Sequence, residues 1–123
     1  MSIGKHHWVI AEGFIPEKGP RPDDPKLSSH ETACILNAGD QQASIELTLY
    51  FSDREPAGPY RIMVPPRRTL HLRFDDLTDP EPLPRETDYA SVFVSDVPVV
   101  VQHTRLDARA ADLALMTSLA WSS

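Results

Sequence analysis

Hydrophobic and polar residues alternate most regularly between Ala43 and Phe51. The odd positions of this segment carry Ala, Ile, Leu, Leu and Phe, whereas the even positions carry Ser, Glu, Thr and Tyr. Successive side chains point to opposite faces of a β-strand, while a helix would scatter these apolar residues around its axis. The pattern therefore predicts a strand with one face in the core and the other in solvent.

Further short apolar runs predict additional strands. They cover residues 7–11, 31–36, 60–64, 70–74, 89–95 and 97–103, and most of the twelve prolines and five glycines lie between them. Many short strands separated by turn residues are typical of an all-β sandwich or barrel. We expect the turn sequence at 37–40 to join 31–36 to Ala43–Phe51 as a hairpin. Only Asp96 separates the last two runs, so the chain must reverse or kink there.

The C-terminal segment, residues 108–120, allows two assignments. Its alanine content favours a helix by intrinsic propensity. Yet Leu113, Leu115, Leu119 and Trp121 fall on one parity, which favours a strand. Both assignments stay open at this point.

Length and composition limit the architecture. A chain of 123 residues with 41% hydrophobic and 24% charged residues has the size and composition of one globular domain. We expect a single-domain antiparallel β-sandwich, jelly-roll-like, over residues 1–123, with a core from about residue 6 to 121. The net charge of −6 argues against a nucleic-acid partner, because phosphate contact needs a basic surface. A local basic patch would still permit that partner.

The single cysteine and the N-terminus bear on the cellular compartment. Cys34 lies in an apolar run, so we expect a free, buried thiol. The first nine residues carry Lys5, His6 and His7 in place of an apolar signal segment, and no apolar run has transmembrane length. A cytoplasmic location is therefore the default expectation.

The sequence shows no motif for phosphate binding, dinucleotide binding, a nucleophile elbow or a zinc protease. No nucleophile–base pair or metal-ligand set stands out either, so we expect no catalytic residues, no metal, no cofactor and no enzymatic activity.

Several polar residues could instead bind a ligand. The pair 30–31 begins a strand, and residues 71 and 73 share a polar strip that suits an anion, a sugar, solvent or a subunit contact. Residues 102–105 follow a run of three valines, and buried polar groups there would need hydrogen-bond partners. The aromatic rings of Trp8, Tyr60 and Trp121 suit either sugar stacking or a core. The candidate ligand-binding residues are His30, Glu31, His71, Arg73, Gln102, His103 and Arg105.

Long blocks of sequence resemble the sensory rhodopsin transducer family, whose founding member is a soluble cyanobacterial protein. The blocks are residues 8–13, 30–40, 52–69, 71–80 and 97–107, so the resemblance covers nearly the whole chain. The segment 17–27 departs from it by being longer and more charged. The resemblance implies a β-sandwich subunit of a homotetramer, with a strand at its C-terminal end. It also implies a membrane photoreceptor, a sensory rhodopsin, as partner.

Two functions follow from the resemblance and the polar residues. The first is a soluble cytoplasmic signalling or adaptor protein, which relays a signal by binding a protein or a ligand. The alternative is a small-molecule binding module without a photoreceptor partner, with carbohydrates among its ligand classes. We expect Tyr50 or Trp121 to help fill a subunit interface.

Overall fold

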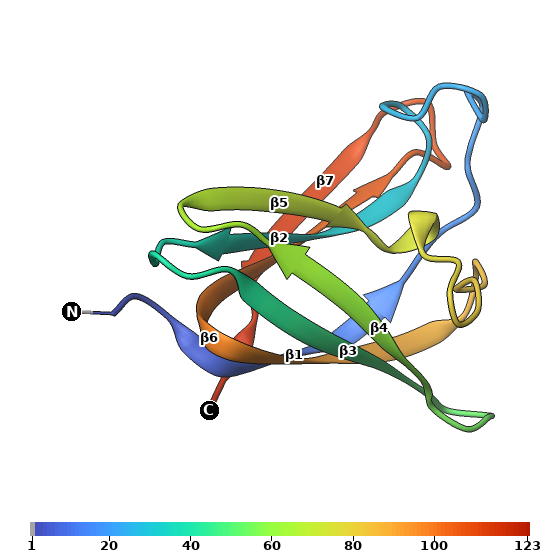
Figure 1. Ribbon diagram of the computed structural model, residues 1–123. Helices are drawn as coiled ribbons and strands as arrows, with labels where there is room; N and C mark the ends of the chain where they lie inside the picture. Colours follow the sequence, from blue (N-terminus) through green and yellow to red (C-terminus); the bar gives the residue numbers. More distant parts are fainter. Residues whose placement is uncertain (1) are drawn as a thin grey trace.

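The computed structural model describes residues 2–123 and consists of antiparallel strands with one turn of 3-10 helix (Figure 1). The elements are β1 (Lys5–Phe14), β2 (His30–Asn37), β3 (Ala43–Phe51), β4 (Ala57–Val64), β5 (Arg68–Arg73), η1 (Phe74–Asp76), β6 (Asp88–Asp107), β7 (Ala114–Leu119) and β8 (Trp121–Ser122). The all-β prediction is confirmed, and the boundaries of β3 match the alternating segment. The C-terminal segment forms strands, as its parity indicated, and not a helix.

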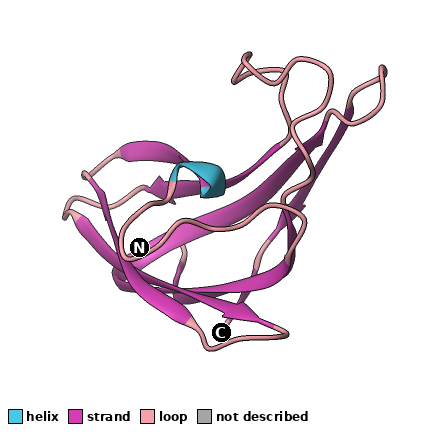
Figure 2. Cartoon of the chain, turned by 90° about the vertical axis from the view of Figure 1, so that its right-hand side faces the viewer, coloured by secondary structure: helices cyan, strands magenta, loops and turns pink. Residues whose placement is uncertain are grey.

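One long strand, β6, pairs with strands of both sheets of the sandwich. Figure 2 shows the strands in magenta and the single helical turn in cyan. Sheet A has the order β4-β3-β6-β1-β8, and sheet B has the order β5-β2-β6-β7. The first part of β6 pairs with β1 and β3, and the part from Val100 onward pairs with β2 and β7. The register between β1 and β6 slips between His7↔Val94 and Lys5↔Val99. The predicted change at Asp96 is therefore a kink that carries the strand from one sheet to the other.

The predicted hairpin between β2 and β3 is wrong. β2 pairs with β5 and β6 in sheet B, whereas β3 pairs with β4 and β6 in sheet A. The intervening turn carries the chain across the sandwich, and the buried Asn37 holds it. The Asn37 amide Nδ2 donates to the carbonyl oxygens of Gln41 at 2.8 Å and Val64 at 3.1 Å, so it ties the end of β2 to the end of β4.

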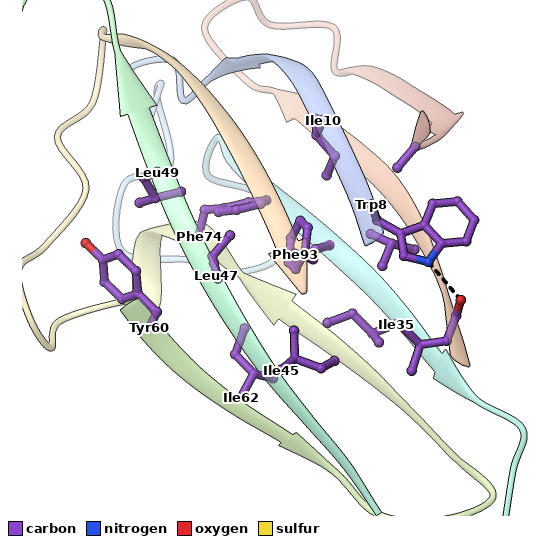
Figure 3. Close-up of a cluster of buried hydrophobic side chains, with 14 of the residues drawn as sticks. Trp8, Ile10, Ile35, Ile45, Leu47, Leu49, Tyr60, Ile62, Phe74 and Phe93 are labelled. Atoms are coloured by element: carbon purple, nitrogen blue, oxygen red, sulfur yellow. Dashed lines mark hydrogen bonds between the residues drawn. The ribbon is translucent and has the colours of Figure 1, made fainter. Parts of the chain in front are cut away.

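The core lies between the two sheets, and Figure 3 shows many of its buried side chains. Ala120, near the C-terminal end, also belongs to this core. Ile45, Leu47 and Leu49 of β3 are buried, as their parity predicted. The ring of Phe74 packs against Phe93 with a centroid separation of 6.4 Å. Aromatic pairs in this arrangement add to the stabilisation that burial provides.

Trp8 is a core residue, since only 4% of it is exposed. Its indole Nε1 donates to the Val99 carbonyl oxygen at 2.8 Å, which is the dashed line in Figure 3. This bond fastens β1 to β6 where their register slips. Trp8 therefore anchors the kink of β6, and its ring is not available as a surface for sugar stacking.

Candidate functional site

A buried carboxylate, Glu31, lies at the centre of a polar cluster inside the sandwich. Glu31 is fully buried and accepts hydrogen bonds from the Phe14 backbone N–H at 2.9 Å and from the Tyr89 hydroxyl. It also accepts from His103 Nε2 at 3.1 Å and from Arg105 Nε at 2.5 Å. Four donors from β1 and β6 thus converge on one side chain of β2.

The register of the strands explains this convergence. Glu31 pairs with Arg105 across β2 and β6, and Ala33 pairs with His103 in the same ladder. Paired residues of antiparallel strands project from the same face of a sheet, so these side chains all point into the sandwich. Tyr89 reaches the cluster from the sheet A part of β6.

The electrostatics of the cluster favour an ionised Glu31. Burial alone raises the pKa of Glu31, but the hydrogen bonds from His103, Tyr89 and Arg105 outweigh burial and hold that pKa below its ordinary value. Burial, followed by the charge of the neighbouring carboxylate, raises the pKa of the Tyr89 phenol, which therefore stays protonated. Arg105 compensates the buried negative charge, as a buried carboxylate requires.

A groove of about 440 Å³ opens beside this cluster, between β1 and the segment that contains β7 and β8. We call it the β1–β7 groove, and it is lined by Val9, Ile10, Ala11, Glu12, His103, Ser118, Leu119, Ala120 and Trp121. His103 is almost completely buried and connects the groove to Glu31. An ionised carboxylate only accepts hydrogen bonds, so Nε2 of His103 carries a hydrogen and Nδ1 is the ring nitrogen left for other contacts.

Arg105 has unused hydrogen-bonding capacity near the same groove. Its Nη2 is buried and finds no hydrogen-bond partner within residues 2–123. An acidic oxygen, Oε1 of Glu12, lies 3.9 Å from Nη2, which is beyond hydrogen-bonding distance. The Glu12 side chain is 84% exposed at the rim of the groove. Buried donors without an acceptor are uncommon in folded proteins.

The other four predicted ligand-binding residues lie apart from the Glu31 cluster. His71 and Gln102 are both neighbours of Cys34 and lie on the outer face of sheet B, around a hollow of about 350 Å³. Cys34 is half-buried, not buried as predicted, because Ala33 and Ile35 occupy the inward positions of β2. His30 is held locally through its Nδ1, 2.8 Å from the Ser28 carbonyl oxygen.

Arg73 belongs to a second polar cluster at the loop end of the sandwich. Its guanidinium contacts the Asp75 carboxylate at 3.1 Å and 2.8 Å and donates to the Pro25 carbonyl oxygen at 2.5 Å. Arg85 joins the same carboxylate at 3.3 Å and donates to Ser29. These contacts fix the charged loop that precedes β2. Arg73, Asp75 and Arg85 also line a polar cleft of about 610 Å³.

Sequence reasoning missed Tyr89, Glu12 and the backbone of Phe14 as parts of the Glu31 cluster and its surroundings. Glu12 lies within the first block that resembles the transducer family, and this was the available signal for it. Tyr89 stands at an inward position of a predicted strand and gave no sign of a polar role.

An exposed apolar surface runs along the C-terminal edge. Leu115, Met116, Leu119 and Trp121 are each more than half exposed, and no charged residue occurs between Leu113 and Ser123. We call residues 113–121 the apolar edge. Exposed apolar stretches of this kind mark contact sites in soluble proteins.

A second exposed surface lies on sheet A. Tyr50, Met63 and Val94 project from its outer face, beside a hollow of about 420 Å³ and the exposed ion pair between Arg61 and Glu46, 2.8 Å apart. We call this surface the sheet A face. The outward positions of β3 thus lie on it, as its parity predicted.

Across residues 2–123, no helix has the length and hydrophobicity that crossing a membrane requires. The search of curated proteins gave no match. Among solved structures, Thermotoga maritima 1070 superposes with a TM-score of 0.86 and 34% identity, covering 98% of this chain and 96% of that one. The Anabaena sensory rhodopsin transducer superposes with a TM-score of 0.72 and 57% identity, covering 85% of this chain and 99% of that one. The family model described as Anabaena sensory rhodopsin transducer matches residues 3–122, and the chain therefore belongs to this family.

Proposed function

We propose that this chain is a cytoplasmic signalling adaptor that relays a signal by binding other proteins and carries out no chemistry of its own. Membership of the transducer family supports this role. The observation that carries it is the apolar edge, where a protein with 24% charged residues exposes an uncharged row of large side chains. Depletion of charge is typical of the centre of protein interfaces.

We assign the apolar edge to contact between copies of this chain, in a homotetramer. Edge strands of soluble proteins usually carry lysine, proline or a bulge that prevents pairing with another strand. β7 contains no lysine and no proline, and its pairing with β6 has no bulge. An uncharged edge meets its own copy without like-charge repulsion, so a two-fold contact between β7 strands suits it.

The partner that receives or sends the signal is a membrane photoreceptor of the sensory rhodopsin type, and we assign it to the sheet A face. Tyr50 and Met63 supply apolar contact area there, and the Glu46–Arg61 ion pair supplies charged groups at its margin. A mixed surface of this kind suits a contact that forms and dissociates during signalling.

Two methionines of nearly equal exposure provide a matched test. Met116 on the apolar edge is 53% exposed, and Met63 on the sheet A face is 52% exposed. We expect Met116→Lys to reduce the mass measured by light scattering, while Met63→Lys keeps the mass of the unchanged protein. In co-sedimentation with liposomes that contain a sensory rhodopsin, Met63→Lys should bind more weakly than the unchanged protein.

Three results would contradict these assignments. A monomeric unchanged protein, or an unaltered mass for Met116→Lys, would remove the apolar edge as a subunit contact. Equal sedimentation with rhodopsin-containing and empty liposomes would remove the photoreceptor as partner. Thermal denaturation of both variants shows whether each is folded, and we expect little change because both side chains are exposed.

A second function, binding of a small molecule, is favoured by the β1–β7 groove. Its volume of about 440 Å³ lies in the range of ligand sites. Most of the residues that line it are apolar, the nearly buried His103 is among them, and Trp121 offers an exposed ring for stacking on a carbohydrate or another flat molecule. A thermal-shift screen with sugars, sugar phosphates and nucleotides tests this role, because a ligand that binds the folded state raises the melting temperature.

A further inference from the structure

His103 has one ring nitrogen that the protein leaves unused. Its Nε2 lies 3.1 Å from Oε2 of Glu31, and its Nδ1 forms no hydrogen bond within residues 2–123. The buried side-chain atoms that lack a partner in this part of the chain are Ser91 Oγ and Arg105 Nη2. Nδ1 is not one of them, so it is accessible from outside. Since His103 lines the β1–β7 groove, with 9% of its side chain exposed, that access is through the groove.

The charges of the buried cluster make this nitrogen an acceptor. Arg105 already compensates the negative charge of Glu31, with its Nε 2.5 Å from Oε2. A second positive charge on His103 would have no partner inside the sandwich, which is costly. The cluster therefore suits a neutral ring that carries its hydrogen on Nε2, and Nδ1 of such a ring accepts a hydrogen bond. A ligand that contacts Nδ1 must supply the donor.

We propose that the β1–β7 groove binds a flat, uncharged aromatic molecule that carries an N–H or O–H donor, as indoles and phenols do. The donor bonds to Nδ1 of His103, and the ring lies against the exposed side chains of Leu119 and Trp121. This proposal rests on the small-molecule function put forward above and names the chemical class of its ligand.

The rest of the groove suits an uncharged ring. Leu119 is 69% exposed and Trp121 is 65% exposed, so a bound ring covers apolar surface that water now covers. Contact between a ligand ring and the indole of Trp121 adds to this gain. Of the residues that line the groove, only Glu12 carries a carboxylate, and that side chain is 84% exposed. A charged ligand would therefore lose hydration in the groove without gaining a buried partner of opposite charge.

Two isomers of methylindole isolate the proposed hydrogen bond. Skatole carries its methyl group on carbon and keeps the ring N–H, whereas N-methylindole has the same composition and no donor. Titration calorimetry with the unchanged protein should give a dissociation constant about three- to tenfold lower for skatole, as one neutral hydrogen bond predicts. The pair p-cresol and its methyl ether repeats the comparison with an O–H donor. Equal affinities within both pairs, or tighter binding of the methylated donors, would overturn the proposal.

Three variants identify the acceptor. His103→Phe removes Nδ1 and should bind skatole and N-methylindole with equal affinity. Ser118→Ala and Glu12→Ala remove other polar side chains of the groove and should keep the preference for skatole. Both of these positions are exposed, so we expect both variants to fold, and their melting temperatures check this. If the preference persists in His103→Phe, or disappears in either of the other variants, His103 is not the acceptor and the proposal fails.

A measurement on the unchanged protein replaces His103→Phe if that variant does not fold. Nitrogen NMR resolves the ring nitrogens of histidine, and saturation with skatole should shift the Nδ1 resonance of His103. N-methylindole should shift it far less, because it forms no hydrogen bond. An equal shift with both isomers, or no shift at saturation, counts against a bond to Nδ1.

The failure of this proposal can be told apart from the failure of the small-molecule function. If none of the four aromatic probes binds, the ligand class is wrong, and a ligand found in the thermal-shift screen with sugars, sugar phosphates and nucleotides would still retain the function. If that screen also gives no ligand, the small-molecule function is removed as well.

Discussion

Replacing Glu31 with glutamine tests whether the buried cluster holds the two sheets together. Glutamine has the same shape, but it offers one acceptor oxygen and an amide that donates. Four donors now point at the carboxylate, from Phe14, Tyr89, His103 and Arg105. In Glu31→Gln, at least one of these donors would meet another donor. The buried guanidinium of Arg105 would also lose its negative partner.

The size of the effect follows from this loss. Removing one partner of a buried ion pair costs about 3–5 kcal/mol, because the remaining charge stays buried without compensation. The free energy of unfolding of a domain of this size is about 5–15 kcal/mol in total. We therefore expect Glu31→Gln to lower the melting temperature by about 10–20 °C.

Urea and thermal unfolding followed by circular dichroism measure this change, with Glu46→Gln as the control. Glu46 lies in an exposed ion pair, so its replacement should leave the melting temperature nearly unchanged. The double variant Glu31→Gln with Arg105→Met should recover part of the loss, because it removes the uncompensated charge. If Glu31→Gln lowers the unfolding free energy by less than about 1 kcal/mol, the cluster does not have the structural role assigned to it.

Three further predictions concern acid stability, the β6 kink and the turn between the sheets. The folded state lowers the pKa of Glu31, so the ionised Glu31 side chain contributes stability above the unfolded pKa, and this contribution is lost as pH falls through the folded pKa. When the free energy of unfolding is measured against pH, Glu31→Gln should therefore lose less stability below about pH 4.5 than the unchanged protein does. Trp8→Phe leaves the Val99 carbonyl without its indole donor and should cost about 1–3 kcal/mol in urea unfolding, and a cost near zero would mean that water replaces the donor. Asn37→Ala removes the amide bonds to Gln41 and Val64 and should cost about 1–3 kcal/mol, whereas Asn37→Asp, which keeps an acceptor but no donor, should not restore them.

Local sequence pattern determined the strands of this protein. The alternation in Ala43–Phe51 set both the boundaries of β3 and its buried face, because side chains of a strand alternate between faces whatever lies around it. The parity of Leu113, Leu115 and Leu119 correctly indicated a strand against the helix propensity of alanine. Propensity is a weak preference, and β6 offers this segment a full set of backbone partners.

The same pattern could not predict which strands pair with one another. A turn between two amphipathic strands joins them either within one sheet or across two sheets, and the alternation is the same in both cases. The expected hairpin after β2 failed for this reason, since contacts of the Asn37 side chain with distant carbonyl groups direct the chain across the sandwich. The sequence predicted either a reversal or a kink at Asp96, and the pairing of β6 with β1 and β2 makes it a kink that links the two sheets.

The sequence by itself determined which segments are strands, which face of each is apolar, and the family of the chain. Only the tertiary structure decided which polar residues meet. Glu31, His103 and Arg105 come together because β2 pairs with the last part of β6, whereas His71 and Gln102 face outward from the same sheet and Arg73 is bound at the loop end. A strand's own pattern fixes inside and outside, but the neighbour opposite each residue depends on register and sheet order, which are set by contacts far apart in the chain.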